Sequence, residues 1–82
     1  MDNATQRPLH AIADEIARDW SKPYFGAVPY LFAMHKLDGI NEDYGYDSGK
    51  SIVLYFLANA GTWRGETARR VKAELKAMAG AK

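Results

Sequence analysis

The chain has 82 residues, enough for one domain, and its 11 basic and 10 acidic side chains give a formal net charge of +1. Such a small net charge excludes a general electrostatic attraction to nucleic acid or to an anionic membrane. The absence of cysteine excludes disulfide bonds, cysteine-based zinc sites, thiolate nucleophiles and iron–sulfur clusters. With 48% hydrophobic and 26% charged residues, the composition is typical of a folded domain.

The first predicted helix covers about residues 7–20, because its apolar side chains recur at helical spacing. They fall within an arc of roughly 100° on a helical wheel and are Leu9, Ile12, Ala13, Ile16 and Trp20. The segment Ser21-Lys22-Pro23 ends this helix, since the residue before a proline avoids helical geometry. After an aromatic loop at 24–27, a second helix is predicted over residues 29–37, and Asp38-Gly39 ends it.

Residues 38–47 are predicted to form a polar loop that holds four of the ten acidic residues, Asp38, Glu42, Asp43 and Asp47. A third helix is predicted over residues 48–60, with Ser48 or Asp47 as its N-cap. Its middle, Ile52–Leu57, is apolar on every side and by itself is equally consistent with a buried strand. No other segment alternates with the period of a strand, so a helix is favoured, and its apolarity favours a central position.

A fourth helix is predicted over residues 63–78, with Ala68, Val71, Leu75 and Met78 on its inner face. Together the elements predict an all-α fold, a small compact domain of four helices over residues 1–82. The chain's ten aromatic residues are expected to supply much of the buried area. The N-terminal Met1–Ala4 does not resemble the start of a secretion signal, and no apolar run is long enough to cross a bilayer. We therefore expect a cytoplasmic protein.

The segment from Gly45 to Gly49-Lys50-Ser51 resembles a phosphate-binding loop but has three residues, instead of four, between its first glycine and the Gly-Lys-Ser end. A capped helix start is the better interpretation, because Ser48 suits an N-cap. The acidic loop does not fit the ligand spacing of an EF-hand in any frame. No serine lies in a nucleophile elbow, and we predict that the protein is not an enzyme.

Two loose histidine–carboxylate pairs, His10 with Asp14 and His35 with Asp38, raise the possibility of a metal site. Catalytic zinc needs three protein ligands and an open position, which the spacing of these pairs does not indicate. A solvated His10 on the polar side of the first helix is the simpler interpretation. We therefore expect neither a metal nor another cofactor.

The fourth predicted helix has an uneven distribution of charge. Arg69, Lys72 and Lys76, here called the basic ridge, fall within about 60° of one another on a helical wheel. A separate stripe of Glu66, Arg70 and Glu74 is expected to be neutralised by pairs of residues four apart. The basic ridge is interpreted either as a contact to phosphates or to an acidic partner, or as a solvated face that keeps a small protein soluble.

Two further residues extend this candidate surface toward the start of the helix. Trp63 either locks the third helix to the fourth, the more common role of a buried aromatic, or is exposed as an anchor for a partner. Arg64, with Thr67, offers side chains for base contacts of the helix-turn-helix kind. A second candidate surface is the acidic loop, whose tyrosines and charges suit a polar interface and comprise Asp43, Tyr44, Tyr46 and Asp47.

Two stretches, Trp20–Leu31 and Tyr55–Arg70 with the lysine-rich helix that follows, resemble small uncharacterised proteins encoded by phages of actinobacteria and by prophages in those hosts. The resemblance covers roughly residues 9 to 78 and brings no defined active site. It implies that the protein acts in a bacterial host cytoplasm by binding a host protein.

From these observations we predict a non-enzymatic helical protein that binds a macromolecule, most simply a protein, with Trp63, Arg64 and the basic ridge as the contact surface. The alternatives are a nucleic-acid-binding module that uses the same ridge and a self-associating structural protein, for which a homodimer is the simplest form.

Overall fold

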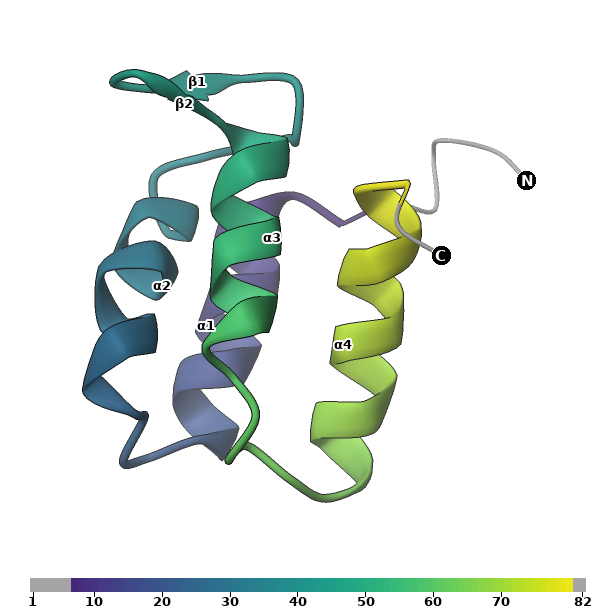
Figure 1. Ribbon diagram of the computed structural model, residues 1–82. Helices are drawn as coiled ribbons and strands as arrows, with labels where there is room; N and C mark the ends of the chain where they lie inside the picture. The colour runs from purple at the N-terminus through teal and green to yellow at the C-terminus, as the bar shows by residue number, and fades with distance from the viewer. Residues whose placement is uncertain (1–6, 81–82) are drawn as a thin grey trace.

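The computed structural model describes residues 7–80 of the chain (Figure 1). The helices in this part are α1 (Leu9–Asp19), α2 (Val28–Met34), α3 (Gly49–Ala58) and α4 (Glu66–Met78), with a 3-10 turn, η2 (Phe25–Ala27), directly before α2. Two strands, β1 (Asp43–Tyr44) and β2 (Asp47–Ser48), lie between α2 and α3. The predicted helices are therefore present in their predicted order. The N-terminal Met1–Ala4, considered above as a possible signal, lies outside the described residues.

The helices enclose one core. Figure 1 shows α3 between α2 and α4, with α1 behind it and α4 antiparallel to α3. Both α1 and α3 contact α2 and α4. All four helices contribute to the largest fully buried side chains, which are Leu9, Ile12, Ile16, Met34, Val53, Phe56, Val71 and Leu75. The result is a compact, mostly helical molecule of 30 × 29 × 22 Å.

The central position predicted for the third helix is correct only in part. Ile52, Val53 and Phe56 are buried, but Leu54 and Tyr55 are 38% and 45% exposed. Helices α2 and α4 contact α3 on two sides, and the side of α3 that carries Leu54 and Tyr55 faces solvent. The apolarity of the segment therefore exceeds what the core requires, and α3 presents hydrophobic surface.

The second helix ends at Met34, three residues before its predicted end, and the backbone that follows accepts hydrogen bonds from the start of α1. The first amides of any helix lack partners within the helix. In α1 the amides of Leu9 and His10 donate to the carbonyls of Asp38, at 3.0 Å, and Leu37, at 2.9 Å. After Met34 the chain continues in tighter turns, in which the amides of Lys36 and Leu37 donate to the carbonyls of Ala33 and Met34.

The predicted loop at 38–47 contains a small β-hairpin, so the all-α prediction holds only as a mostly helical fold. Asp43 pairs with Ser48 and Tyr44 with Asp47 in an antiparallel register. Gly45 has a φ of 66°, at the turn position where a two-residue hairpin loop favours glycine. The strands are too short, and too exposed, to show an alternating hydrophobic pattern.

The start of α3 is built from a serine cap and a glycine. The Ser48 hydroxyl oxygen accepts a hydrogen bond from the amide of Ser51 at 3.1 Å, which confirms Ser48 as the N-cap. A Cβ on Gly49 would lie 2.6 Å from the carbonyl oxygen of Gly39 and 2.8 Å from the Cα of Ile40. Only glycine allows this approach, and it fixes α3 against the chain after α2.

None of the helices in residues 7–80 is both long enough and apolar enough to cross a membrane.

Candidate functional site

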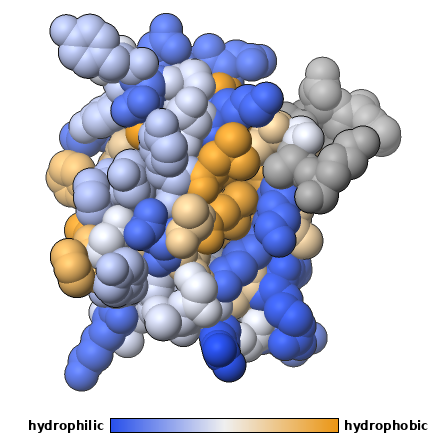
Figure 2. All heavy atoms as spheres, viewed as in Figure 1, coloured by the Kyte–Doolittle hydropathy of each residue, from blue (hydrophilic) through white to orange (hydrophobic). Residues whose placement is uncertain are grey.

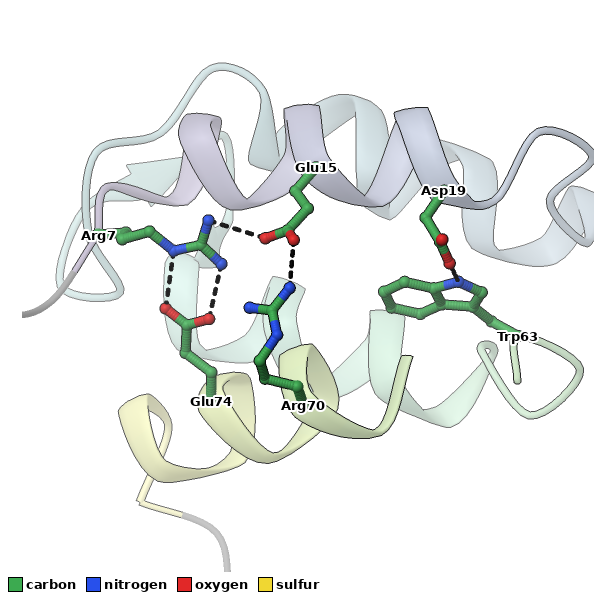
Figure 3. A network of polar contacts seen from close by, with 6 residues as sticks. All are labelled: Arg7, Glu15, Asp19, Trp63, Arg70 and Glu74. Carbon is green, nitrogen blue, oxygen red and sulfur yellow. Dashed lines mark hydrogen bonds and ion pairs between the residues drawn. The ribbon is translucent and has the colours of Figure 1, made fainter. Parts of the chain in front are cut away.

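Helix α4 has a neutralised flank that faces α1. Arg70 forms an ion pair with Glu15 of α1, and Glu74 accepts two hydrogen bonds from Arg7, at 3.0 and 2.7 Å (Figure 3). Arg7 also lies 2.9 Å from Glu15. The predicted stripe is thus neutralised at Arg70 and Glu74, but by pairs between separate elements and not by pairs within the helix.

These contacts hold the network in its charged form. The hydrogen bond from Arg70, with a smaller contribution from Arg7, keeps the pKa of Glu15 below its usual value, although burial acts in the opposite direction. The hydrogen bond to Glu74 likewise raises the pKa of Arg7. The network therefore joins residue 7, α1 and α4 at neutral pH and has no charge left for a partner.

The opposite flank of α4 carries the basic ridge, which forms no ion pair within residues 7–80. Arg69 and Lys76 are exposed, and Lys72 is half-buried. In the described part of the chain, no carboxylate forms an ion pair with any of these three residues. The contrast between the two flanks is therefore a property of the folded structure and not only of the helical wheel.

Lys72 differs from the other two ridge residues because it also supports the fold. Its Nζ donates a hydrogen bond to the carbonyl oxygen of Trp63 at 2.6 Å and lies 5.9 Å from the centre of that indole ring. Burial, followed by the charges of Lys76 and Arg64, lowers the pKa of Lys72. Arg64 lines the same pocket as Arg69 and Lys72, so it lies beside the ridge.

Trp63 is a core residue, and the alternative of an exposed anchor is wrong. Its side chain is only 2% exposed and stacks on Trp20, with ring centres 5.8 Å apart. Its indole N–H donates to a carboxylate oxygen of Asp19 at 2.8 Å (Figure 3). The ring therefore locks α4 to α1 and α3, and only its backbone, through Lys72, contributes to the basic surface.

A pocket of about 250 Å³ lies at the start of α4, beside the basic ridge. It is lined by Gly61, Trp63, Arg64, Gly65, Ala68, Arg69 and Lys72, so three of its lining residues are cationic. The sequence indicated these basic residues. The pocket itself depends on the turn that brings Gly61 next to Arg69, which no local pattern predicts.

The arrangement of α3 and α4 does not match a helix-turn-helix. The two helices of that motif cross at a large angle, whereas α4 runs antiparallel beside α3 (Figure 1). Thr67 lines a different pocket, with Glu15, Arg18 and Asp19, on the flank of α4 that faces α1. Arg64 and Thr67 are therefore not brought together as base-reading side chains.

The second candidate surface is the β-hairpin. Tyr46 at its tip is fully exposed, Tyr44 is 39% exposed, and Asp43 is also exposed, while Asp47 is half-buried. The structure thus places the four residues together at one end of the molecule, away from the basic ridge (Figure 1).

The glycine-rich segment before α3 is not arranged as a phosphate-binding loop. The amide of Gly49 donates to the carbonyl oxygen of Glu42 at 2.6 Å, and the amide of Lys50 donates to that of Ile40 at 2.9 Å. Because these amides are used within the fold, the segment serves to begin α3.

The two histidines exchange the partners that sequence spacing suggested. His10 contacts Asp38 at 3.2 Å and His35 contacts Asp14 at 3.3 Å, so both pairs link α1 to the chain around the end of α2. Among residues 7–80, no group of three or more histidine, aspartate or glutamate side chains could hold a metal ion.

An exposed apolar stripe on η2 and α2 differs from the expectation that the aromatic residues supply much of the buried area. Phe25 is 79% exposed and Phe32 is 60% exposed, and Val28 lies between them at helical spacing. Lys36 lies over the ring of Phe32, 5.1 Å from its centre. The spacing of these residues was visible in the sequence, but an apolar stripe does not reveal which of two apolar faces the core uses.

Comparisons of the chain with protein-family models, with curated proteins and with solved structures find no match.

Proposed function

We propose that the protein is a non-enzymatic binding module that engages a partner protein through the basic ridge and Arg64. The observation that carries this proposal is the asymmetry of α4. Its basic residue on the flank toward α1, Arg70, is paired with Glu15. On the other flank Arg69 and Lys76 are exposed, and no ion pair involves them within residues 7–80.

A protein partner is favoured over nucleic acid by the extent of the basic surface. A protein that binds a nucleic-acid backbone makes many phosphate contacts and usually has a strongly positive net charge. Here the exposed basic residues of the ridge occupy one flank of one helix, and the whole chain has a net charge of +1. A short acidic segment of a protein matches a surface of this size better than a phosphate backbone does.

An affinity capture experiment tests the proposal. The full chain is immobilised and exposed to nuclease-treated lysate of an actinobacterium, the kind of host that the sequence resemblance implies. Captured proteins are compared between wild type and the double variant Arg69→Ala/Lys76→Ala. Lys72 is left in place, because its bond to Trp63 would mix a loss of binding with a loss of stability.

The matched control is Arg18→Ala/Lys22→Ala, which removes two exposed basic residues outside α4. We expect wild type and control to capture the same proteins and the ridge variant to lose them. Equal capture by the ridge variant would show that this surface is not the contact. Capture from an untreated lysate that is absent from the nuclease-treated lysate would instead favour the nucleic-acid alternative.

A further inference from the structure

Helix α3 places an apolar strip beside the basic ridge. Tyr55 packs on Tyr30 of α2, with ring centres 5.4 Å apart, so this flank of α3 faces α2. The opposite flank of α3, toward α4, carries Leu54 and Leu57, which are three residues apart on one face of the helix. Lys50, one turn before Leu54, lies on the same flank. Leu54 is 38% exposed, and Leu57 is partly buried against the core.

The orientation of α4 places its basic flank beside the apolar strip of α3. Arg70 and Glu74 face α1, so the ridge lies on the flank toward α3, which α4 contacts. Figure 2 shows hydrophobic surface exposed between α3 and α4, with hydrophilic side chains along its α4 border. The molecule therefore has a composite surface, with leucines along one side and, along the other, the ridge cations, which form no ion pair within residues 7–80.

We infer that this composite surface is the docking site for an acidic amphipathic helix of the partner protein. The inference rests on the proposed function and specifies the partner's chemistry. Because α3 and α4 are antiparallel neighbours, a third helix lying along their junction can contact Leu54 and Leu57 with apolar side chains three or four residues apart. Carboxylates beside those apolar positions then lie against Lys72 and Lys76.

Charge complementarity and position distinguish this occupant from others. A phosphate backbone would match the cations but would leave the two leucines uncovered. A bilayer is expected to engage the most exposed aromatic side chains, Phe25 at 79% and Tyr46 at full exposure, and neither belongs to this surface. An acidic amphipathic helix can cover the leucines with its apolar side chains and pair its carboxylates with the cations.

The test uses a fluorescein-labelled helical peptide in which leucines occupy one face at i, i+3, i+4 and i+7 and glutamates occupy the adjacent flank. Its binding to the full chain is measured by fluorescence anisotropy. We expect Leu54→Ser and Arg69→Ala/Lys76→Ala each to weaken binding by about tenfold or more. The control Arg18→Ala/Lys22→Ala should bind as wild type does. A peptide with glutamine in place of glutamate should also bind about tenfold more weakly.

Because Leu54 is partly exposed, Leu54→Ser should retain the fold, as measured by circular dichroism, and Leu54→Gln provides a second apolar-to-polar change. Equal binding of the glutamate and glutamine peptides would overturn the inference. So would binding of duplex DNA or of phosphatidylglycerol vesicles that depends on the ridge but not on Leu54.

The capture experiment separates this inference from the proposed function. If capture requires Arg69 and Lys76 but not Leu54, and the acidic peptide does not compete for it, the proposed function holds and the helical docking mode is wrong. If capture does not require Arg69 and Lys76, the proposed function itself fails.

Discussion

Trp63 is held at both ends of its residue, by Asp19 on the indole N–H and by Lys72 on the backbone carbonyl. The first contact ties Trp63 to α1 and the second ties it to α4, so the tryptophan is fixed within the core although glycines lie on both sides of it in the sequence. The same contacts mean that a basic-ridge residue and a core residue share one stabilising interaction. Changes at this point therefore affect folding before they affect binding.

Removing the Asp19 carboxylate should destabilise the protein through Trp63. An indole N–H that loses its partner costs up to about 3 kcal/mol when buried, but Asp19 is exposed and water reaches the site, so we expect about 1 kcal/mol. The measurement is urea unfolding of Asp19→Ala, followed by circular dichroism. Asp14→Ala makes the same change on α1 and removes only an exposed contact to His35. Equal stabilities of the two variants would contradict the role of the Trp63 contact.

The pKa of Lys72 should respond to its neighbour on the ridge. Lys76 is the larger of the two charges that lower this pKa, so Lys76→Ala should move the pKa of Lys72 upward, toward the usual value. It should stay below that value, because burial is the larger cause. Nitrogen NMR of the lysine side chains measures the titration. An unchanged pKa in Lys76→Ala would mean that the two amines do not interact across one turn of α4.

At the scale of elements, Gly49 decides whether α3 can meet the chain after α2. A methyl group there would lie 2.6 Å from a backbone oxygen, and backbone atoms cannot be moved aside as a flexible side chain can. We expect Gly49→Ala to cost about 2 kcal/mol or more in the free energy of unfolding. Gly61→Ala is the control, because no atom lies within 4 Å of its added Cβ. Similar unfolding midpoints in urea for both variants would show that the close approach is not rigid.

The helices were predictable because their signals are local. The apolar spacing of Leu9 to Trp20 and of Ala68 to Met78 identifies the inner faces of α1 and α4, which the structure confirms. The hairpin was not predictable, since two-residue strands have no periodicity to detect. The hydrogen bonds from α1 to the backbone after α2 join residues far apart in sequence, so no local pattern reveals them.

The candidate site, like the fold, was predictable from the sequence in part only. The clustering of Arg69, Lys72 and Lys76 on one flank follows from helical spacing and could be derived from the sequence. The burial of Trp63 beneath Lys72, and the neutralisation of Arg70 by Glu15, are contacts between distant segments. The apolar strip of α3 was visible as hydrophobic sequence, but only the packing of three helices shows which side of it is left open.

For the whole molecule, the network of Arg7, Glu15 and Arg70 predicts a loss of stability in acid. The folded-state pKa of Glu15 is below its unfolded value, so its stabilising contribution is complete above about pH 4.3, the usual pKa of glutamate, and is lost as the pH falls through the lower folded-state pKa. Glu15→Gln should be less stable at neutral pH by about 1–2 kcal/mol and should depend less on pH over this range. Urea unfolding at several pH values measures both. Parallel pH profiles for variant and wild type would rule out Glu15 as the acid-sensitive group.

Both tryptophans of the chain lie in one stack, with ring planes only 11° apart. Two indoles at this separation couple their electronic transitions, so opening the stack should change the near-ultraviolet circular dichroism of the protein. The intrinsic optical signals of tryptophan therefore originate at one end of the molecule, where α4 begins. A spectroscopist who follows only those signals would not see the hairpin at the opposite end come loose.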